Sequence, residues 1–357
     1  MKRKKNKIRE KVVHWMETQG VFNISVVMAG FLTLTSLGVV TLLLFATCGQ
    51  APASGGQKDA ATKDTLRTGM GDTPHTARYR RPEIPQMMTD PRQRAFYYVK
   101  HYWDEYSLAD TAFIRSADTE QLFADFVDAL KYVDLQESGT ALRNMMNLME
   151  TDSTAYAHFC FLSEKYFYDP NSPMRNEEYY IPVLEQMLDS HRLTEYEKLR
   201  PADQLEQSLK NRPGDVAADF TYVTPQDMNK AQRMSNVKAD YTLLFFYNPD
   251  CSNCREYEGI LAGIPAFVEL QEKGALRVLA VYPDEDRDEW LLKSPHMPKG
   301  WIVGWNKQGD IRGKMLYDIR ATPTLYLLDK QKKVILKDAP LERVIQYLAA
   351  VYPQQAE

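Results

Sequence analysis

The sequence predicts two folded domains behind an N-terminal membrane segment. The first is an all-α domain, and the second is an α/β domain with a central mixed sheet flanked by helices. An uncharged apolar run near the N-terminus, helical spacing of apolar residues from about position 91, and a short apolar run at 241–247 support this division. The chain of 357 residues is long enough for two domains plus extensions. We place the segment boundaries at 1–23, 24–47, 48–90, 91–212 and 213–357.

Residues 1–47 are typical of a membrane anchor. Seven Lys or Arg residues lie within the first eleven positions, and no charged residue occurs from Ile24 to Phe45. About 20 apolar residues suffice to cross a bilayer as a helix. Positively charged flanks stay on the cytoplasmic side, so we expect residues 1–23 to be cytoplasmic and everything after residue 47 to be extracytoplasmic.

Cys48 allows a second interpretation of the same segment. It follows the apolar run and precedes small and polar residues, so residues 24–47 could be a lipoprotein signal that is removed before Cys48 is acylated. The uncleaved anchor is favoured because Phe45-Ala46-Thr47 only loosely matches a lipobox and the basic and apolar parts are long. Both interpretations place the folded domains in the cell envelope, held at the membrane.

Residues 48–90 lack apolar periodicity and are expected to form a disordered tether. Residues 91–212 instead show five or six stretches with helical spacing and short connections, which predicts an all-α bundle. We expect Asp118 and Asp152 to cap two of these helices.

The chemically reactive side chains of the helical region favour structural roles. Cys160 lies between Phe159 and Phe161, and a buried inert thiol is favoured over a redox role. His101 and His158 are isolated in the sequence, which favours a structural hydrogen bond over metal ligation. We therefore expect no metal site here.

Cys251 and Cys254 follow a predicted strand and open a predicted helix. Residues 241–247 are almost entirely apolar, as in a strand buried on both faces, and Asn248-Pro249-Asp250 ends them. At a helix N-terminus, unpaired N–H groups and the helix dipole favour the thiolate, which is the reactive form of cysteine. Cys254, one turn later, is placed to attack a mixed disulfide on Cys251. This arrangement predicts thiol–disulfide exchange.

With these motifs, the segment from about residue 214 to 351 resembles a thioredoxin-like domain, closest to the membrane-tethered thiol–disulfide interchange proteins. A second motif, Ala321-Thr322-Pro323-Thr324 before an apolar strand, matches the family's cis-proline loop. The resemblance implies that Pro323 is cis and that Thr322 and Pro323 bind the incoming peptide beside the cysteines. The region 91–212 resembles an uncharacterised helical domain that precedes such domains in some envelope proteins.

The sequence also departs from the family pattern. Asp250 stands where many thioredoxins have Trp, and its charge is expected to oppose a thiolate at Cys251. Phe245 replaces thioredoxin's buried acid, so the proton of Cys254 needs another acceptor or water. Pro323 lies 72 positions after Cys251, which indicates an inserted element around residues 286–300.

These observations predict an extracytoplasmic, membrane-held thiol–disulfide oxidoreductase of the reductase or interchange type. We expect protein or small-molecule disulfides or thiols as substrates, a membrane thiol donor, and no cofactor. A net charge of −4 gives no reason to expect nucleic acid. The alternative is an envelope binding or scaffold protein, in which the helical domain recognises a partner and the thioredoxin-like domain is structural or a redox sensor.

Two other chemistries fit the C-x-x-C pattern less well. Zinc would need four ligands, and no second cysteine pair or nearby Cys/His cluster exists in the sequence. A peroxiredoxin-like peroxidase would need Thr or Ser three positions before the cysteine, with an Arg partner, whereas Pro249 and Asp250 precede Cys251.

Overall fold

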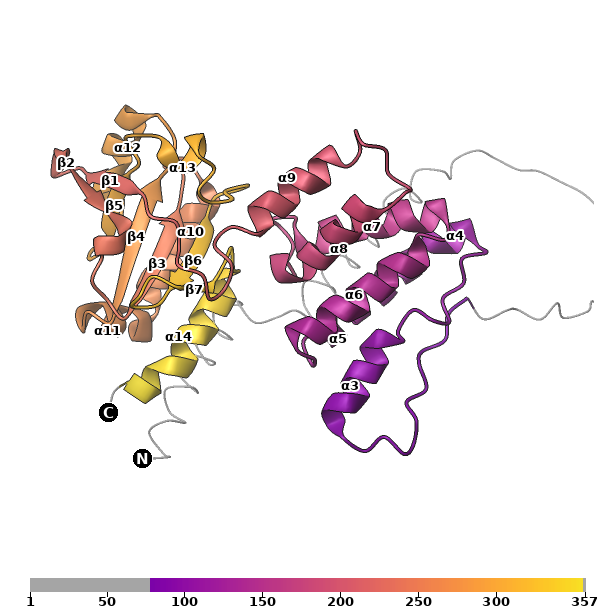
Figure 1. Cartoon of the computed structure of the whole chain (residues 1–357). Helices are drawn as coiled ribbons and strands as arrows, with labels where there is room; N and C mark the ends of the chain where they lie inside the picture. Colours follow the sequence, from indigo (N-terminus) through magenta and orange to yellow (C-terminus); the bar gives the residue numbers. More distant parts are fainter. Residues whose placement is uncertain (1–77, 356–357) are drawn as a thin grey trace, which may run out of the picture. The chain divides into compact units, whose positions relative to one another are not determined.

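The computed structural model describes residues 78–355, and the side chains up to residue 351. Within it, one group of helices precedes a sheet that carries helices of its own (Figure 1). The predicted anchor at 24–47 and Cys48 lie outside the described residues. Across 78–355, none of the helices combines the length and the apolar character that a membrane crossing requires.

Seven helices make up the first group, and aromatic side chains form much of their core. The rings of Trp103 and Phe159 lie 4.9 Å apart at its centre, edge to face, and Phe123 contacts Phe159 at 6.0 Å. Such edge-to-face pairs stabilise a core beyond their buried area. The helices are α3 (Pro91–Lys100), α4 (Thr111–Ile114), α5 (Ala117–Leu130), α6 (Leu135–Met149), α7 (Ser153–Phe167), α8 (Glu177–Asp189) and α9 (Leu199–Ser208).

Capping side chains mark where the helices begin, and one of the two predicted caps differs in the structure. Asp152 caps α7 as predicted, because its carboxylate accepts the N–H groups of Thr154 and Ala155. The prediction that Asp118 caps α5 was wrong. Ser116 holds that position and accepts the N–H of Thr119, so α5 begins one residue before Asp118, which lies in its first turn.

The second group is built on a seven-stranded mixed sheet in the order β2-β1-β5-β4-β3-β6-β7. The β3, β4 and β5 strands are parallel, as predicted for β3 and β4, and the remaining neighbours pair antiparallel. The strands are β1 (Thr221–Thr224), β2 (Asp227–Arg233), β3 (Tyr241–Phe246), β4 (Leu276–Tyr282), β5 (Ile302–Trp305), β6 (Thr324–Leu328) and β7 (Val334–Leu336). The predicted mixed sheet flanked by helices is confirmed.

The helices of this group are α10 (Ser252–Gly263), α11 (Pro265–Glu272), α12 (Arg287–Lys293), α13 (Asp310–Gly313) and α14 (Leu341–Gln355), with short 3₁₀ turns η1 (Met234–Asn236) and η2 (Ser294–His296). All residues of β3 and β6 are buried, as expected for strands covered on both faces. The segment 286–300, where the sequence predicts an insertion, forms α12 and η2 between β4 and β5. It is anchored by Trp290, whose ring lies 5.8 Å from that of Trp305.

A glycine in β5 allows β1 to lie close against it. A Cβ atom at Gly304 would come within 2.9 Å of the ring of Tyr222 in β1, closer than such contacts allow.

We predict that Gly304→Ala lowers the free energy of unfolding by about 1–3 kcal/mol, as over-packing in cores does. Gly259→Ala, on the exposed face of α10 with no atom within 4 Å of the new methyl group, is the control. It should stabilise by about 0.5–1 kcal/mol, since it removes a helical glycine. Urea unfolding of both variants tests this, and equal stability of the two would contradict it.

Candidate functional site

The site lies at the turn that connects β3 to α10. The side chain of Asn248 accepts the N–H of Asp250 at 2.9 Å, and its backbone carbonyl accepts the N–H of Cys251 at 3.1 Å. This turn sets Cys251 at the N-cap of α10, where its sulfur accepts the N–H of Cys254 at 3.1 Å. The sulfur thus occupies the position in which Ser or Asp oxygens usually cap a helix, next to the positive end of the helix dipole.

A loop distant in the sequence contacts the other side of the Cys251 sulfur. The S–H of Cys251 donates to the backbone carbonyl of Thr322 in this loop at 3.3 Å. The peptide bond between Thr322 and Pro323 is cis, as the family resemblance implied. The structure therefore brings together the four predicted site residues, Cys251, Cys254, Thr322 and Pro323.

Strand register explains why these segments meet. The β3 and β6 strands pair antiparallel, with Phe246 opposite Thr324. The residues that follow the end of β3 consequently lie beside those that precede the start of β6. A slip of one residue would turn every side chain of the strand to the opposite face, so the buried faces of both strands hold this register.

The two cysteines have different environments. Cys251 is partly exposed, whereas Cys254 is 1% exposed. Burial raises the pKa of Cys254 far above the ordinary thiol value, and the adjacent Cys251 sulfur adds to this effect. Cys251 is thus the thiol that a partner can reach, and Cys254 is a buried thiol that holds its proton until something removes it.

Asp250 has a countercharge in the structure. The Lys293 ammonium lies 3.4 Å from the Asp250 carboxylate, on the last turn of α12 in the inserted element. Both side chains are solvent-exposed, so this pair is a weak surface ion pair.

The acid that the sequence analysis could not locate has a candidate in Glu258. Phe245 is fully buried, with its ring 5.3 Å from that of Trp301, and a phenyl ring has no group that can accept a proton. Glu258 lies one helical turn after Cys254 on α10, a spacing that puts two side chains on the same face. Burial raises the pKa of Glu258 to about 7, while Arg255 acts in the opposite direction.

Tyr247 supports this placement of Glu258. Burial raises the pKa of the Tyr247 phenol, and the charges of both Glu258 and Cys254 raise it further. One buried side chain at the end of β3 therefore feels both groups. The i, i+4 spacing from Cys254 to Glu258 was visible in the sequence, but the partial burial of Glu258 was not.

The remaining chemical candidates lie away from this site. Burial raises the pKa of Cys160 to about 12, which agrees with an inert thiol. The imidazole of His101 lies 2.7 Å from Asp104, and burial lowers the pKa of His158. Between residues 78 and 355, no three His, Cys, Asp or Glu side chains gather closely enough to hold a metal ion.

Comparisons with known proteins point to a family for the larger part of the chain. A domain of unknown function, DUF5106, matches residues 47–211, which include all seven helices of the first group. A crystal structure of a thioredoxin-like protein from Bacteroides caccae is 44% identical, covers 76% of this chain and 98% of its own, and superposes with a TM-score of 0.72.

Shorter structures match part of the chain. A conserved protein of unknown function from Bacteroides fragilis is 64% identical over 38% of this chain and 98% of its own, with a TM-score of 0.37. The C-terminal domain of an uncharacterised protein from the same species is 45% identical over 39% of this chain and 98% of its own, with a TM-score of 0.38. No curated protein matches. By its similarity to the Bacteroides caccae protein over nearly the whole of that chain, this chain belongs to the thioredoxin-like proteins.

Proposed function

We propose that this protein is a thiol–disulfide oxidoreductase that works through Cys251 and Cys254. The observation that carries the proposal is the position of the Cys251 sulfur, partly exposed at the N-terminus of α10 and hydrogen-bonded by Cys254 and Thr322. A nucleophilic thiolate needs solvent access and nearby positive dipoles, and this position supplies both.

The reaction proceeds by two exchange steps. The Cys251 thiolate attacks one sulfur of the substrate disulfide, forming a mixed disulfide and releasing the other substrate sulfur as a thiolate, which takes up a proton. Deprotonated Cys254 then attacks the Cys251 sulfur, which breaks the mixed disulfide and releases the second substrate thiolate. The substrate disulfide gains two electrons, and the Cys251–Cys254 pair becomes the disulfide.

Glu258 is the proposed acceptor of the Cys254 proton. The second step needs the Cys254 thiolate, although burial favours the thiol. A base whose conjugate acid has a pKa near the working pH is best suited to take such a proton. The carboxylate of Glu258, whose pKa burial raises to about 7, lies one turn away and meets that requirement. It would act directly or through one water molecule.

The membrane attachment and the direction of the reaction are part of the same proposal. The basic N-terminus and the apolar run 24–45 support a membrane-held protein with its folded domains on the extracytoplasmic side, where thiol–disulfide chemistry is common. There it would reduce or exchange protein disulfides and be recharged by a membrane thiol donor. The family resemblance of the C-x-x-C and cis-proline motifs favours the reductase or interchange role.

Insulin reduction by the protein tests the roles of the two cysteines. We expect Cys251→Ser to abolish turnover, because no other described cysteine combines exposure with a helix N-terminus. Cys254→Ser should form a mixed disulfide with the substrate and stop there, which non-reducing mass spectrometry detects. Cys160→Ser, which changes a thiol in the helical group, is the control and should retain full turnover. Absence of turnover in the unaltered protein would favour the scaffold alternative.

The pH profile of insulin reduction tests Glu258. A base accepts a proton only when it is ionised, so the rate of the second step should rise as the pH passes through about 7. Glu258→Gln should lose this rise and slow the step by about tenfold or more at pH 8. Glu256→Gln, an exposed neighbour on α10, is the control and should keep the wild-type profile. An unchanged profile in Glu258→Gln would rule out the proposed proton acceptor.

A further inference from the structure

The loop that carries Thr322 and Pro323 is held from its far side by the helical group. This loop runs from residue 314 to 323, between α13 and β6. Its Arg320 lies two residues before Thr322, and its guanidinium contacts the segment between α7 and α8. The carbonyl of Tyr168 accepts a hydrogen bond from Arg320, and the guanidinium carbon lies 3.7 Å from the centre of the Tyr168 ring.

Three carboxylates surround the same guanidinium. Arg320 donates to Glu177 at 2.8 Å and to Asp338 at 2.7 Å, and its Nε lies 3.1 Å from Asp318. Tyr168 closes the arrangement, since its hydroxyl donates to Asp318 at 2.9 Å. Tyr168 and Glu177 belong to the helical group, whereas the other three residues belong to the sheet-containing group.

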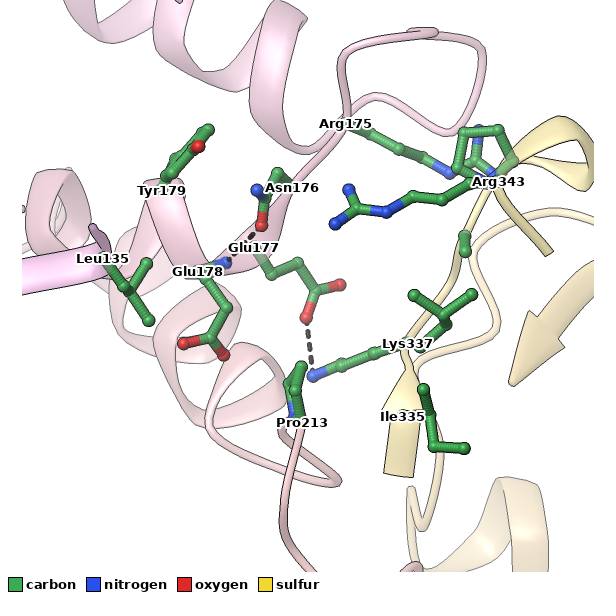
Figure 2. A pocket seen from close by; sticks show the side chains of 13 residues that line it. Leu135, Arg175, Asn176, Glu177, Glu178, Tyr179, Pro213, Ile335, Lys337 and Arg343 are labelled. Atoms are coloured by element: carbon green, nitrogen blue, oxygen red, sulfur yellow. Dashed lines mark hydrogen bonds and ion pairs between the residues drawn. The ribbon is translucent and has the colours of Figure 1, made fainter. Parts of the chain in front are cut away.

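Lys337, directly after β7, makes a second connection to the same glutamate (Figure 2). Its ammonium lies 2.6 Å from the Glu177 carboxylate. The same ammonium donates to the carbonyls of Gln207, Ser208 and Lys210, at 3.1, 2.9 and 2.6 Å. These carbonyls end α9, where a cation is stabilised by unpaired carbonyls and the helix dipole.

The whole cluster is buried and its charges balance. Arg320 is 15% exposed, and the side chains of Glu177, Asp338 and Asp318 are 10% exposed or less. With Arg175, which donates to the Asp338 carbonyl at 2.8 Å, three cations face three carboxylates. Burial raises the pKa of both Glu177 and Asp338, although the neighbouring cations oppose the shift. A buried network of this kind is rigid only while every member keeps its partner.

Only Ala321 separates Arg320 of this cluster from Thr322, which contacts the reactive sulfur. Thr322, two residues after Arg320, supplies the carbonyl that accepts the S–H of Cys251. Arg312 also fixes the loop, through the carbonyl of Ile319 at 2.7 Å, but that contact comes from the sheet-containing group itself. The helical region also binds the start of the loop, where Lys210 and Asn211 donate to the carbonyls of Met315 and Leu316. Arg320 makes its contacts to the helical group nearest to Thr322, only two residues away.

We propose that the helical domain positions the dithiol site, holding the loop of Thr322 and Pro323 through Tyr168, Glu177 and Arg320. Arg320 is a positioning residue, since it acts on Cys251 through Thr322. The inference rests on the proposed exchange chemistry. It gives the helical domain a task within the catalytic cycle, because any partner that displaced Tyr168 or Glu177 would change the reactivity of the cysteines.

Two adjacent glutamates on α8 provide a matched test in the full-length chain. Glu177 binds Arg320, whereas Glu178 pairs with Arg212 at 2.9 and 2.6 Å and does not touch the loop. We would compare Glu177→Gln, Arg320→Lys and Glu178→Gln. Each variant is equilibrated with reduced and oxidised glutathione, starting once from the fully reduced and once from the fully oxidised protein, to obtain its redox equilibrium constant. Insulin reduction then gives kcat and KM separately. Thermal unfolding shows that each variant is folded.

The proposal predicts a difference between the two glutamate variants. A displaced Thr322 carbonyl no longer accepts the S–H of Cys251, a bond that stabilises only the reduced state. Glu177→Gln and Arg320→Lys should therefore make the couple more reducing, by about threefold in the equilibrium constant. Their kcat/KM for insulin should fall by about tenfold, since the loop that receives the peptide is misplaced. Glu178→Gln should change neither value by more than about twofold.

The outcomes separate this inference from the proposed function. Equal equilibrium constants in folded Glu177→Gln and Glu178→Gln overturn the inference, even when both reduce insulin well. Failure of the unaltered protein to reduce insulin overturns the reductase role. The glutathione equilibrium would still show whether the helical domain affects the stability of the Cys251–Cys254 disulfide. Should Glu177→Gln not fold, Tyr168→Phe provides the test, because it removes just the hydroxyl bond to Asp318. It should shift the equilibrium in the same direction, and no shift would overturn the inference.

Discussion

The chemistry of this protein depends on where one sulfur atom is held. The Cys251 sulfur accepts an N–H from Cys254 at 3.1 Å and donates to the carbonyl of Thr322 at 3.3 Å. The first contact is local to α10, and the second spans 71 positions of the sequence. Because β3 and β6 pair with Phe246 opposite Thr324, the buried sheet fixes the distance between them. Sheet packing therefore brings the two segments together, and the loop before β6 places the Thr322 carbonyl against the sulfur.

The same loop links the two groups of the chain electrostatically. Arg320 binds carboxylates from both groups and lies against the ring of Tyr168. Charges in a buried cluster lose their hydration, so each is stable only with its partners in place. An arginine suits this position because its planar guanidinium can bind several acceptors and an aromatic face together. We interpret the helical group as part of the structure that holds the site in place.

Local sequence patterns were sufficient to predict the strand β3 and the helix that follows it, and family motifs predicted the four residues that meet at the site. The insertion around residues 286–300 was predicted from the 72 positions between Cys251 and Pro323. Glu258 and Arg320 were missed because their importance comes from burial and from partners far away in the sequence, such as Tyr168 for Arg320. The exposed, polar β2 was missed as well, because pairing with β1 rather than apolar periodicity makes it a strand. That Asp250 opposes a thiolate at Cys251 stays a prediction, and its countercharge at Lys293 could be found only from the fold.

Brief alkylation of the reduced, native protein by iodoacetamide directly tests which cysteine is the attacking thiol. Peptide mass spectrometry then shows which cysteine has reacted. We expect Cys251 to be modified first. Cys254, which is 1% exposed, and Cys160, whose pKa burial raises to about 12, should react only after unfolding. Modification of Cys254 or Cys160 before Cys251 would contradict the assignment of Cys251 as the attacking thiol.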